Sequence, residues 1–404
     1  MTKFKKPELV APAGDWASLY SAAEAGADAV YFGVKGMNMR YGARNFDALE
    51  MKKIAEYLHG EGKKSYLALN VLVYNDELDK VKTILEKASK AGIDAVILWD
   101  MAVLSAAKEL GIKAHLSTQA SVSNLEALKV YCRLGVERLV LARECGLSDI
   151  RKIILGIRGE KLKCGIEVFI HGAMCLSVSG RCLLSQYSFN KSANRGECIQ
   201  PCRRQFVITD KDKECEYLLA EDYILSTKDL CTVGFIDKLI EAGINAFKIE
   251  GRMRPPEYVS RVTSVYRKAI DAFFEKKLDS KLKKELFKQL GFTFNRGFTD
   301  GFYFKQPLDL GEPPAKKYEK IYLGEIKKFY KKLAVAEVLM SAGKLESGQM
   351  ILITGKKTAA CFSRIKEIEI DHKPVRVINK GETAGIKLDF EVKPKDKVFL
   401  WKEL

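Results

Sequence analysis

A helix-to-strand phrase recurs along the first 250 residues, and it restricts the fold more than any other feature. At residues 25–30, 91–96, 134–139 and 242–247, a segment of helical period ends in Ala-Gly or Leu-Gly, and an apolar run follows within three residues. Glycine tolerates the left-handed backbone that ends many helices, so each phrase predicts a short helix-to-strand turn. Eight such strand-like runs alternate with helical segments, which is the pattern of βα units. They are Glu8–Ala13, Ala29–Gly33, Ser65–Val71, Ala95–Asp100, Ala114–Gln119, Arg138–Arg143, Ile166–His171 and Ala246–Gly251.

Eight units with short turns predict a closed (β/α)₈, TIM-like barrel over residues 1–275. The alternative is an open doubly wound sheet, but residues 11–15, which end the first run, lack the G-x-G-x-x-G spacing of a dinucleotide fingerprint. About 60 residues separate the seventh run from the next helix, which predicts a functional insertion at residues 172–232. We expect a helical extension and linker at 276–317. Short strands broken by glycine predict a small C-terminal all-β barrel domain at 318–404.

The chain is basic, with 68 Lys and Arg against 52 Asp and Glu, a formal charge of +16. No apolar run approaches the ~18 residues of a membrane span, and the N-terminus has no signal-peptide core, so we expect a cytoplasmic protein without membrane contact. The charge permits an anionic partner such as RNA, to which several lysines would contribute, although a solvated surface explains them nearly as well. These are Lys316, Lys317, Lys327, Lys328, Lys331 and Lys332.

Seven of the ten cysteines lie within one sixth of the chain: Cys164, Cys175, Cys182, Cys198, Cys202, Cys215 and Cys231. In a reducing compartment, such clusters more often hold metal or perform redox chemistry than form disulfides. Only Cys198 and Cys202 form a tight pair. The wide spacing of the others favours an iron–sulfur cluster over a zinc ribbon, and unliganded thiols remain the minority interpretation.

Polar residues gather at the predicted C-terminal strand ends, where barrel enzymes place their catalytic groups. Buried polar groups need partners, so this set favours a polar or charged ligand, while internal pairing, for example of Lys248 with Glu250, is the structural alternative. A Schiff-base role for Lys248 is disfavoured by the neighbouring carboxylate. The rim set is Asn70, Asp100, His115, Ser117, Gln119, Glu167, His171, Lys248, Glu250 and Arg252.

Residues 167–185, EVFIHGAMCLSVSGRCLLS, resemble the signature of the collagenase-like peptidase family, first grouped as peptidases of unknown catalytic type. Residues 8–14, 31–33, 194–203, 247–252, 295–298 and 301–302 are also similar to it, so the resemblance covers nearly the whole chain. Several members of this family are oxygen-independent hydroxylases of RNA or quinones.

The resemblance to the hydroxylase branch implies a 4Fe-4S cluster held by Cys175, Cys182, Cys198 and Cys231, with Cys202 as the competing ligand. The C-terminal domain is similar to the small barrel of the tRNA-modifying members, which implies an RNA-binding role. The implied reaction forms 5-hydroxyuridine at the tRNA wobble position, with prephenate, a small dicarboxylate, as hydroxyl donor.

In that reaction, guanidinium groups suit the donor's carboxylates, and buried acids or histidines could move protons. The candidates for substrate binding are Arg181, Arg203, Arg252, Lys248, Asn70 and Gln119. The candidates for catalysis are His171, Glu250 and Glu167.

Three alternatives stay open. A peptidase would use His171 and Glu167 with a metal or a cysteine nucleophile, although the chain has no H-E-x-x-H and no nucleophile-elbow motif. The chain could instead hydroxylate another RNA. A pure RNA-binding module would leave the polar rim and the cysteine cluster unexplained.

Overall fold

The computed structural model describes residues 4–204, 206–209, 216–219, 223–304, 310–311 and 318–404. Cys215, Lys316, Lys317 and the rest of the end of the predicted extension and linker, residues 312–317, lie outside the described residues.

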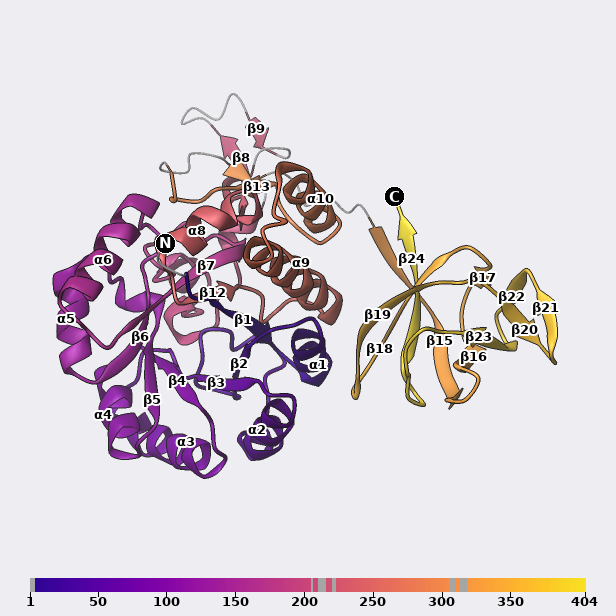
Figure 1. Cartoon of the computed structure of the whole chain (residues 1–404), viewed down its shortest axis with the longest axis horizontal. Helices are drawn as coiled ribbons and strands as arrows, with labels where there is room; N and C mark the ends of the chain where they lie inside the picture. The colour runs from indigo at the N-terminus through magenta and orange to yellow at the C-terminus, as the bar shows by residue number, and fades with distance from the viewer. Residues whose placement is uncertain (1–3, 205, 210–215, 220–222, 305–309, 312–317) are drawn as a thin grey trace.

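Eight parallel strands form a closed barrel, as predicted (Figure 1). Each strand pairs with the next, and the last strand pairs with both the seventh and the first, so the open-sheet alternative is excluded. The strands are β1 Glu8–Ala13, β2 Ala29–Gly33, β3 Lys64–Ala68, β4 Ala95–Leu98, β5 Lys113–Leu116, β6 Val136–Val140, β7 Gly165–Ala173 and β12 Ala246–Ile249.

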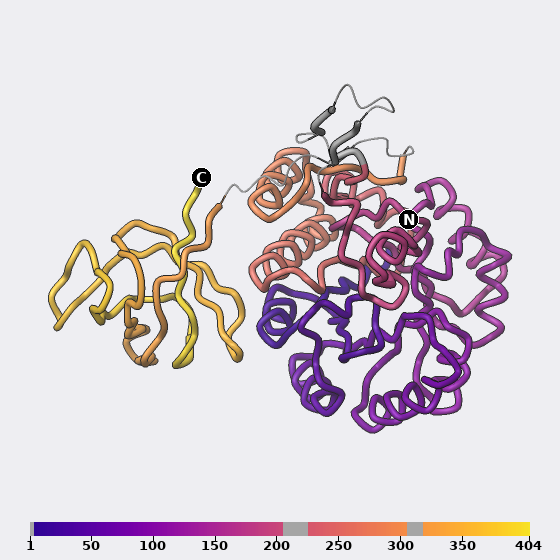
Figure 2. Tube along the Cα trace, turned by 180° about the vertical axis from the view of Figure 1, so that it is seen from behind, coloured from indigo at the N-terminus to yellow at the C-terminus, as the bar shows by residue number. Residues whose placement is uncertain are grey.

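Helices surround the barrel and pack their apolar faces against the strands (Figures 1 and 2). They are α1 Trp16–Glu24, α2 Met51–Gly60, α3 Leu78–Lys90, α4 Met101–Glu109, α5 Leu125–Arg133, α6 Leu147–Gly159, α8 Ile236–Ala242 and α9 Pro256–Phe274, and α10 Ser280–Gly291 follows. Gly26, Gly92, Gly135 and Gly243 have φ of +92°, +73°, +96° and +86°. The recurrent phrase therefore ends helices with a left-handed glycine, as the sequence predicted.

Several predicted strands extend further toward the C-terminal rim than the observed ones. The third was expected to reach Val71 but ends at Ala68, and the fifth ends at Leu116, before the short 3₁₀ turn Thr118–Ala120. At this rim the backbone leaves the ladder and turns its polar side chains toward the barrel axis, so period-two apolarity overestimates strand length there.

Charged side chains fill the lower interior of the barrel. Glu167, only 1% exposed, accepts hydrogen bonds from Lys248 Nζ at 2.7 Å and Arg138 Nη1 at 3.2 Å. Arg138 Nη1 also donates to Glu8 Oε1 at 2.6 Å, and the Tyr66 hydroxyl donates to the same oxygen. We call Glu8, Arg138, Glu167 and Lys248 the interior charge layer. Its two acids and two bases balance, as buried charges require.

The predicted insertion leaves the barrel after β7 and returns before α8. It contains α7 Leu184–Phe189, β8 Phe206–Thr209, β9 Glu216–Leu219, β10 Tyr223–Thr227 and β11 Asp229–Cys231. β11 pairs antiparallel with the end of β7 and parallel with β13 Phe298–Thr299. β10 also pairs with β14 Leu310–Gly311.

The C-terminal region is all-β, as predicted, and its strands pair antiparallel. Its main sheet has the order β19-β18-β24-β15-β16-β23-β20-β21, with a separate β17–β22 pair. The strands are β15 Tyr318–Tyr330, β16 Val335–Met340, β17 Lys344–Glu346, β18 Met350–Gly355, β19 Thr358–Arg364, β20 Ile368–Ile370, β21 Lys373–Val375, β22 Val377–Asn379, β23 Thr383–Lys387 and β24 Lys397–Glu403.

This β-region sits beside α1 and α9 of the barrel, and Figure 2 shows the contact from behind. The backbone N–H of Ala360 on β19 donates to Ser21 Oγ on α1 at 2.9 Å, and both groups are buried. Lys320 on β15 pairs with Glu257 on α9 at 3.0 Å. None of the described helices has both the length and the apolar composition needed to cross a bilayer.

The interior charge layer predicts a large stability effect. Arg138→Met leaves the buried Glu167 with Lys248 alone and Glu8 with the half-exposed Lys64, so we expect a loss of about 3 kcal/mol in the free energy of unfolding, measured by urea titration. Lys113→Met is the control, because Lys113 forms an exposed 3.6 Å pair with Glu137 and should cost at most about 1 kcal/mol. Equal losses in the two variants would contradict a structural role for the layer.

Candidate functional site

A pocket of about 510 Å³ opens at the C-terminal end of the barrel, between the strand ends and the insertion. Tyr31, Asn70, Gln119 and Phe169 line its barrel side, and the β7–α8 insertion supplies the opposite wall. A barrel active site is expected at this end, and a pocket of this size suits a small-molecule or nucleotide ligand.

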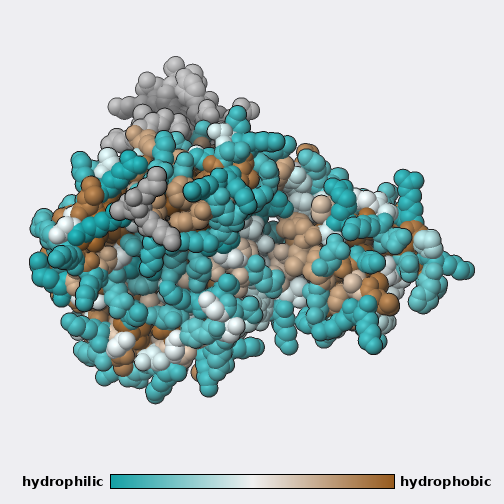
Figure 3. Space-filling view, viewed as in Figure 1, coloured by the Kyte–Doolittle hydropathy of each residue, from teal (hydrophilic) through white to brown (hydrophobic). Residues whose placement is uncertain are grey.

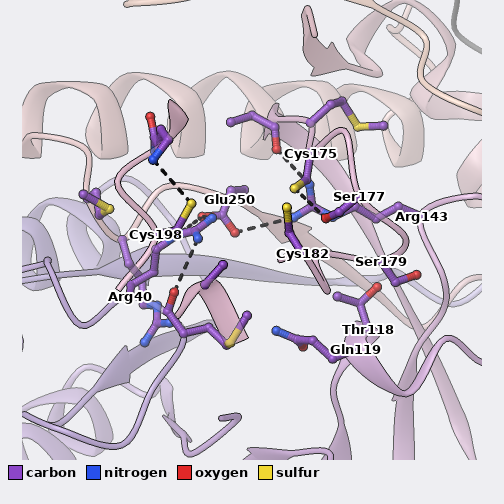
Figure 4. A pocket seen from close by; sticks show the side chains of 18 of the residues that line it. Arg40, Thr118, Gln119, Arg143, Cys175, Ser177, Ser179, Cys182, Cys198 and Glu250 are labelled. Atoms are coloured by element: carbon purple, nitrogen blue, oxygen red, sulfur yellow. Dashed lines mark hydrogen bonds and ion pairs between the residues drawn. The ribbon is translucent and has the colours of Figure 1, made fainter. Parts of the chain in front are cut away.

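Four cysteines line the insertion wall: Cys175, Cys182, Cys198 and Cys202. Figure 4 shows the first three on the same side of the cavity, across from Gln119. Burial raises the pKa of Cys198 and Cys202, and the neighbouring cysteines, when ionised, raise it further. A cation among these thiols would reverse that effect, and thiolates are the donors that iron–sulfur clusters take. Among the described residues, no group of three His, Cys, Asp or Glu side chains is arranged to enclose a metal ion.

Cys231, the fourth ligand implied by the family resemblance, lies elsewhere. It belongs to β11, where it pairs with His171 of β7, and it is not among the residues lining the pocket. Its Sγ is 3.9 Å from the Tyr266 hydroxyl, and burial raises its pKa to about 12. The geometry therefore groups the alternative ligand, Cys202, with the other three thiols.

Glycine allows the insertion to approach the barrel closely. At Gly172 (φ +109°), an added Cβ would lie 2.7 Å from the Glu250 carbonyl oxygen. At Gly196 (φ +86°), it would lie 2.1 Å from the Asn38 carbonyl oxygen, and the Gly196 carbonyl accepts from the Tyr41 N–H at 3.0 Å. These contacts hold the cysteine wall against the strand ends and the loop after β2.

Glu250 is the centre of a cationic cluster on the barrel side of the pocket. Its Oε1 accepts from Arg40 Nη2 at 2.9 Å and Nε at 3.2 Å, and its Oε2 lies 3.7 Å from Arg143 Nη2 (Figure 4). Although burial opposes ionisation, Arg40, Arg143 and Arg252 lower the pKa of Glu250 to about 2. Glu250 is therefore a fixed carboxylate at neutral pH, which is unsuited to a general acid.

Among the described residues, Arg252 has no carboxylate within ion-pair distance, and Glu250 attracts it only at longer range. It is 5% exposed, and its Nη1 donates to the neutral amide oxygen of Asn38 at 3.0 Å. Burial lowers its pKa to about 10. A bound carboxylate would supply the missing counter-charge.

The whole pocket has a strong excess of positive charge. Its described lining includes one carboxylate, Glu250, and seven cationic side chains: Arg40, Arg143, Arg203, Lys248, Arg252, Arg254 and Arg296. Lys248 is already paired with Glu167, and Arg254 and Arg296 with Asp229, so the excess comes from the other four. Such a pocket favours an anionic ligand.

The other predicted binding residues differ in whether they line the pocket. Asn70 and Gln119 line the pocket and interact with each other and with Ser117. Arg203 also lines it, but its guanidinium donates to Ser226, to Thr227 and to the Met174 carbonyl, which holds the insertion together. Arg181 lies outside the pocket lining and donates to Ser121 Oγ at 3.0 Å.

Two of the three predicted catalytic residues are away from the pocket. Glu167 lies below it in the interior charge layer. His171 is enclosed by Tyr258, Tyr266 and Phe298 on the other side of β7, and burial lowers its pKa to about 3, so it is neutral. No histidine is among the described lining residues.

Comparison with known proteins shows the family. Residues 14–312 match the family described as "Peptidase family U32". The chain belongs to peptidase family U32. It is 40% identical over 406 residues to a protein named "Collagenase" from Porphyromonas gingivalis, covering 97% of each chain.

Other relatives of this U32 chain are named for RNA modification. It is 37% identical over 309 residues to "tRNA hydroxylation protein P1" of Bacillus subtilis, covering 75% of this chain and 72% of that protein. It is 35% identical over 353 residues to a 23S rRNA 5-hydroxycytidine synthase of Escherichia coli, covering 84% and 52%. The expected family is therefore confirmed, and its members carry both peptidase and hydroxylase names.

Sequence reasoning missed Arg40 and Arg143 in this U32 site. Arg143 ends the predicted sixth strand run, so its position at the rim was the available signal. Arg40 lies in the loop after β2, and only the folded contact with Glu250 reveals it.

The Glu250 cluster predicts a pH-dependent difference in stability. The pKa of the Glu250 carboxyl is about 2 in the folded protein and near 4.5 in the unfolded chain. Ionised Glu250 therefore contributes its full stabilisation to the free energy of unfolding above about pH 4.5, and this contribution is lost as pH falls toward 2. We expect Glu250→Gln to lower the free energy of unfolding by about 3 kcal/mol at pH 7. In urea titrations, the difference in the free energy of unfolding between Glu250→Gln and the wild type should become smaller below pH 4.5. A gap that is unchanged between pH 7 and pH 3 would contradict this assignment.

Proposed function

We propose that the chain is an RNA-modifying, oxygen-independent hydroxylase that forms 5-hydroxyuridine at the tRNA wobble position. Prephenate would be the hydroxyl donor, and a 4Fe-4S cluster the cofactor. One observation carries the proposal: a single pocket combines four thiols with seven cations and one carboxylate. The relatives named for tRNA and rRNA hydroxylation support the same class of reaction.

Cys175, Cys182, Cys198 and Cys202 would hold the cluster on the insertion wall, within the same pocket as Arg252 and Glu250. When bound, a 4Fe-4S cluster supplies one-electron transfer. Conversion of a base C–H to C–OH is a two-electron oxidation. The donor would be the oxidant, because it would give up its hydroxyl oxygen and be reduced by two electrons, and the cluster would pass those electrons singly between base and donor.

Arg252 would hold one donor carboxylate, because it is a buried guanidinium whose hydrogen bond in the described structure goes to the neutral amide oxygen of Asn38. Arg143 would assist, since its Nε is buried without a hydrogen-bond partner among the described residues. Glu250 would orient Arg40 and Arg143 rather than move protons. Asn70 and Gln119, at the base of the pocket, offer amide groups to the edge of a pyrimidine.

The cluster proposal predicts which cysteines retain iron. After anaerobic purification, Cys198→Ala and Cys202→Ala should lose the iron, the sulfide and the brown visible absorption. Cys231→Ala should keep them, and Cys361→Ala on β19 is a control outside the pocket. Iron loss in Cys231→Ala with retention in Cys202→Ala would instead restore the ligand set implied by the family resemblance.

The reaction is tested by mass spectrometry of tRNA nucleosides. A deletion strain should lack 5-hydroxyuridine, the wild-type gene should restore it, and Arg252→Gln should restore much less. In calorimetry, Arg252→Gln should bind prephenate about 10- to 150-fold more weakly, the range for a lost hydrogen bond to a charged group. Unchanged 5-hydroxyuridine in the deletion strain would refute the proposed reaction.

A peptidase remains the second candidate, because a relative named collagenase is 40% identical over 97% of the chain. Cys175 and Ser177 interact at 2.9 Å in the pocket, but neither has a histidine base among the described lining residues. Gelatin degradation by a purified, colourless protein would favour this function over hydroxylation.

A further inference from the structure

A second cavity of about 390 Å³ lies where the β-region meets the barrel, and we call it the interdomain groove. The start of α9 and the segment 292–294 form one side, and β15, β19 and β24 form the other. In the view of Figure 3, apolar side chains gather in the hollow between the two parts, on an otherwise largely hydrophilic face. Its lining includes Glu257, Arg261, Phe294, Tyr318, Phe362 and Trp401.

Aromatic rings dominate the lining. Tyr318 stacks on Trp401 with centroids 5.5 Å apart and planes at 21°, and Phe362 meets Trp401 edge-on at 5.2 Å. Phe292 in turn meets the Tyr318 ring edge-on at 5.2 Å. Tyr318, Phe362 and Trp401 are only partly buried, although they are large enough to fill a core. Partly exposed rings in a concave site can stack on planar groups.

The charges of the groove balance, which argues against a site for phosphate alone. Two acids, Glu257 and Glu319, face two bases, Arg261 and Lys320, and Lys320 is already paired with Glu257. Arg261 lies over the Phe362 ring at 5.0 Å and has no carboxylate partner among the described residues. A neutral aromatic site with one available cation suits an uncharged planar ring that is attached to an anionic backbone.

The interdomain groove adjoins the catalytic pocket. Phe294 lines the groove, and the guanidinium groups of Arg254 and Arg296 lie over its ring at 4.2 and 5.0 Å. Both arginines line the catalytic pocket. The thickness of one side-chain layer therefore separates the two cavities, so one strand of RNA could reach both.

We propose that the interdomain groove stacks an unpaired nucleobase of the RNA substrate, near the base held in the catalytic pocket. This inference rests on the proposed function, because it requires an RNA substrate. It gives the β-region a specific role in binding, in which Tyr318, Phe362 and Trp401 form the stacking surface and Arg261 meets the adjoining phosphate.

The probe is an unmodified tRNA transcript with a wobble uridine, bound to the full-length protein with its cofactor, followed by fluorescence anisotropy. Trp401→Ala and Phe362→Ala should weaken binding about 5- to 150-fold, the range for loss of one stacked base. Trp401→Phe keeps a ring and should largely restore affinity. The slope of log affinity against log salt should not change in these variants, whereas Arg261→Gln should reduce it by about one phosphate contact.

Tyr330→Ala is the matched control, because Tyr330 is an exposed aromatic residue at the opposite end of β15 from Tyr318. A spectroscopic test leaves the groove residues unchanged. In the Trp16→Phe, Trp99→Phe double variant, Trp401 is the remaining tryptophan, and its fluorescence should be quenched by a single-stranded anticodon-loop oligonucleotide but not by duplex RNA.

Affinities of Trp401→Ala and Phe362→Ala within twofold of Tyr330→Ala, or no quenching of Trp401, would overturn the stacking role. So would an altered salt slope in Trp401→Ala. Wild-type formation of 5-hydroxyuridine alongside any of these results would mean that only the groove assignment fails. The opposite outcome is also distinguishable. If the groove variants weaken tRNA binding as expected, but the deletion strain still contains 5-hydroxyuridine, only the proposed reaction fails.

Discussion

The interior charge layer determines what the upper rim of the barrel can present. Glu167 is almost fully buried, so it is tolerated only while Lys248 and Arg138 remain beside it. Lys248 reaches Glu167 because β12 pairs with β7 in one register, with Ala246 opposite Glu167 and Lys248 opposite Phe169. A shift by one residue would turn Lys248 outward and leave Glu167 unpaired. The same register brings Glu250, two residues beyond Lys248, to the pocket.

The pocket also brings acidic and basic side chains together, but their charges do not balance. In the interior charge layer two acids meet two bases, whereas around Glu250 one carboxylate meets several guanidinium groups. An excess of buried positive charge reduces stability unless a ligand neutralises it. The described lining of the pocket therefore favours a bound anion. Thiols on the facing wall add soft donor groups, so the two walls suit different ligands within one cavity.

Period-two patterns and helix-ending glycines were enough to predict the barrel, the long insertion and the all-β C-terminal region. They also predicted Asn70, Gln119, Lys248 and Arg252 at the pocket. They placed His171 there because it follows Glu167 and Phe169 at even spacing. The register of β7 against β12 shifts at this point, since Lys248 pairs with Phe169 but Ile249 pairs with His171. That irregularity reverses which side chains of β7 face the barrel interior, so His171 points outward. A period-two sequence pattern predicts neither this irregularity nor the contact between Arg40 and Glu250.

The segment after β12 contributes residues to both cavities. Within eight residues it supplies Glu250 and Arg252 to the pocket at the end of the barrel, Arg254 to the boundary between the two cavities, and Glu257 to the interdomain groove. Arg254 also lies 3.9 Å from Asp229, which is buried on β11 of the insertion and pairs with Arg296 at 3.3 Å. Asp229 thus holds together the two guanidinium groups that flank Phe294. Because one carboxylate fixes both, the distance between the two cavities is set by the same insertion that carries the cysteines.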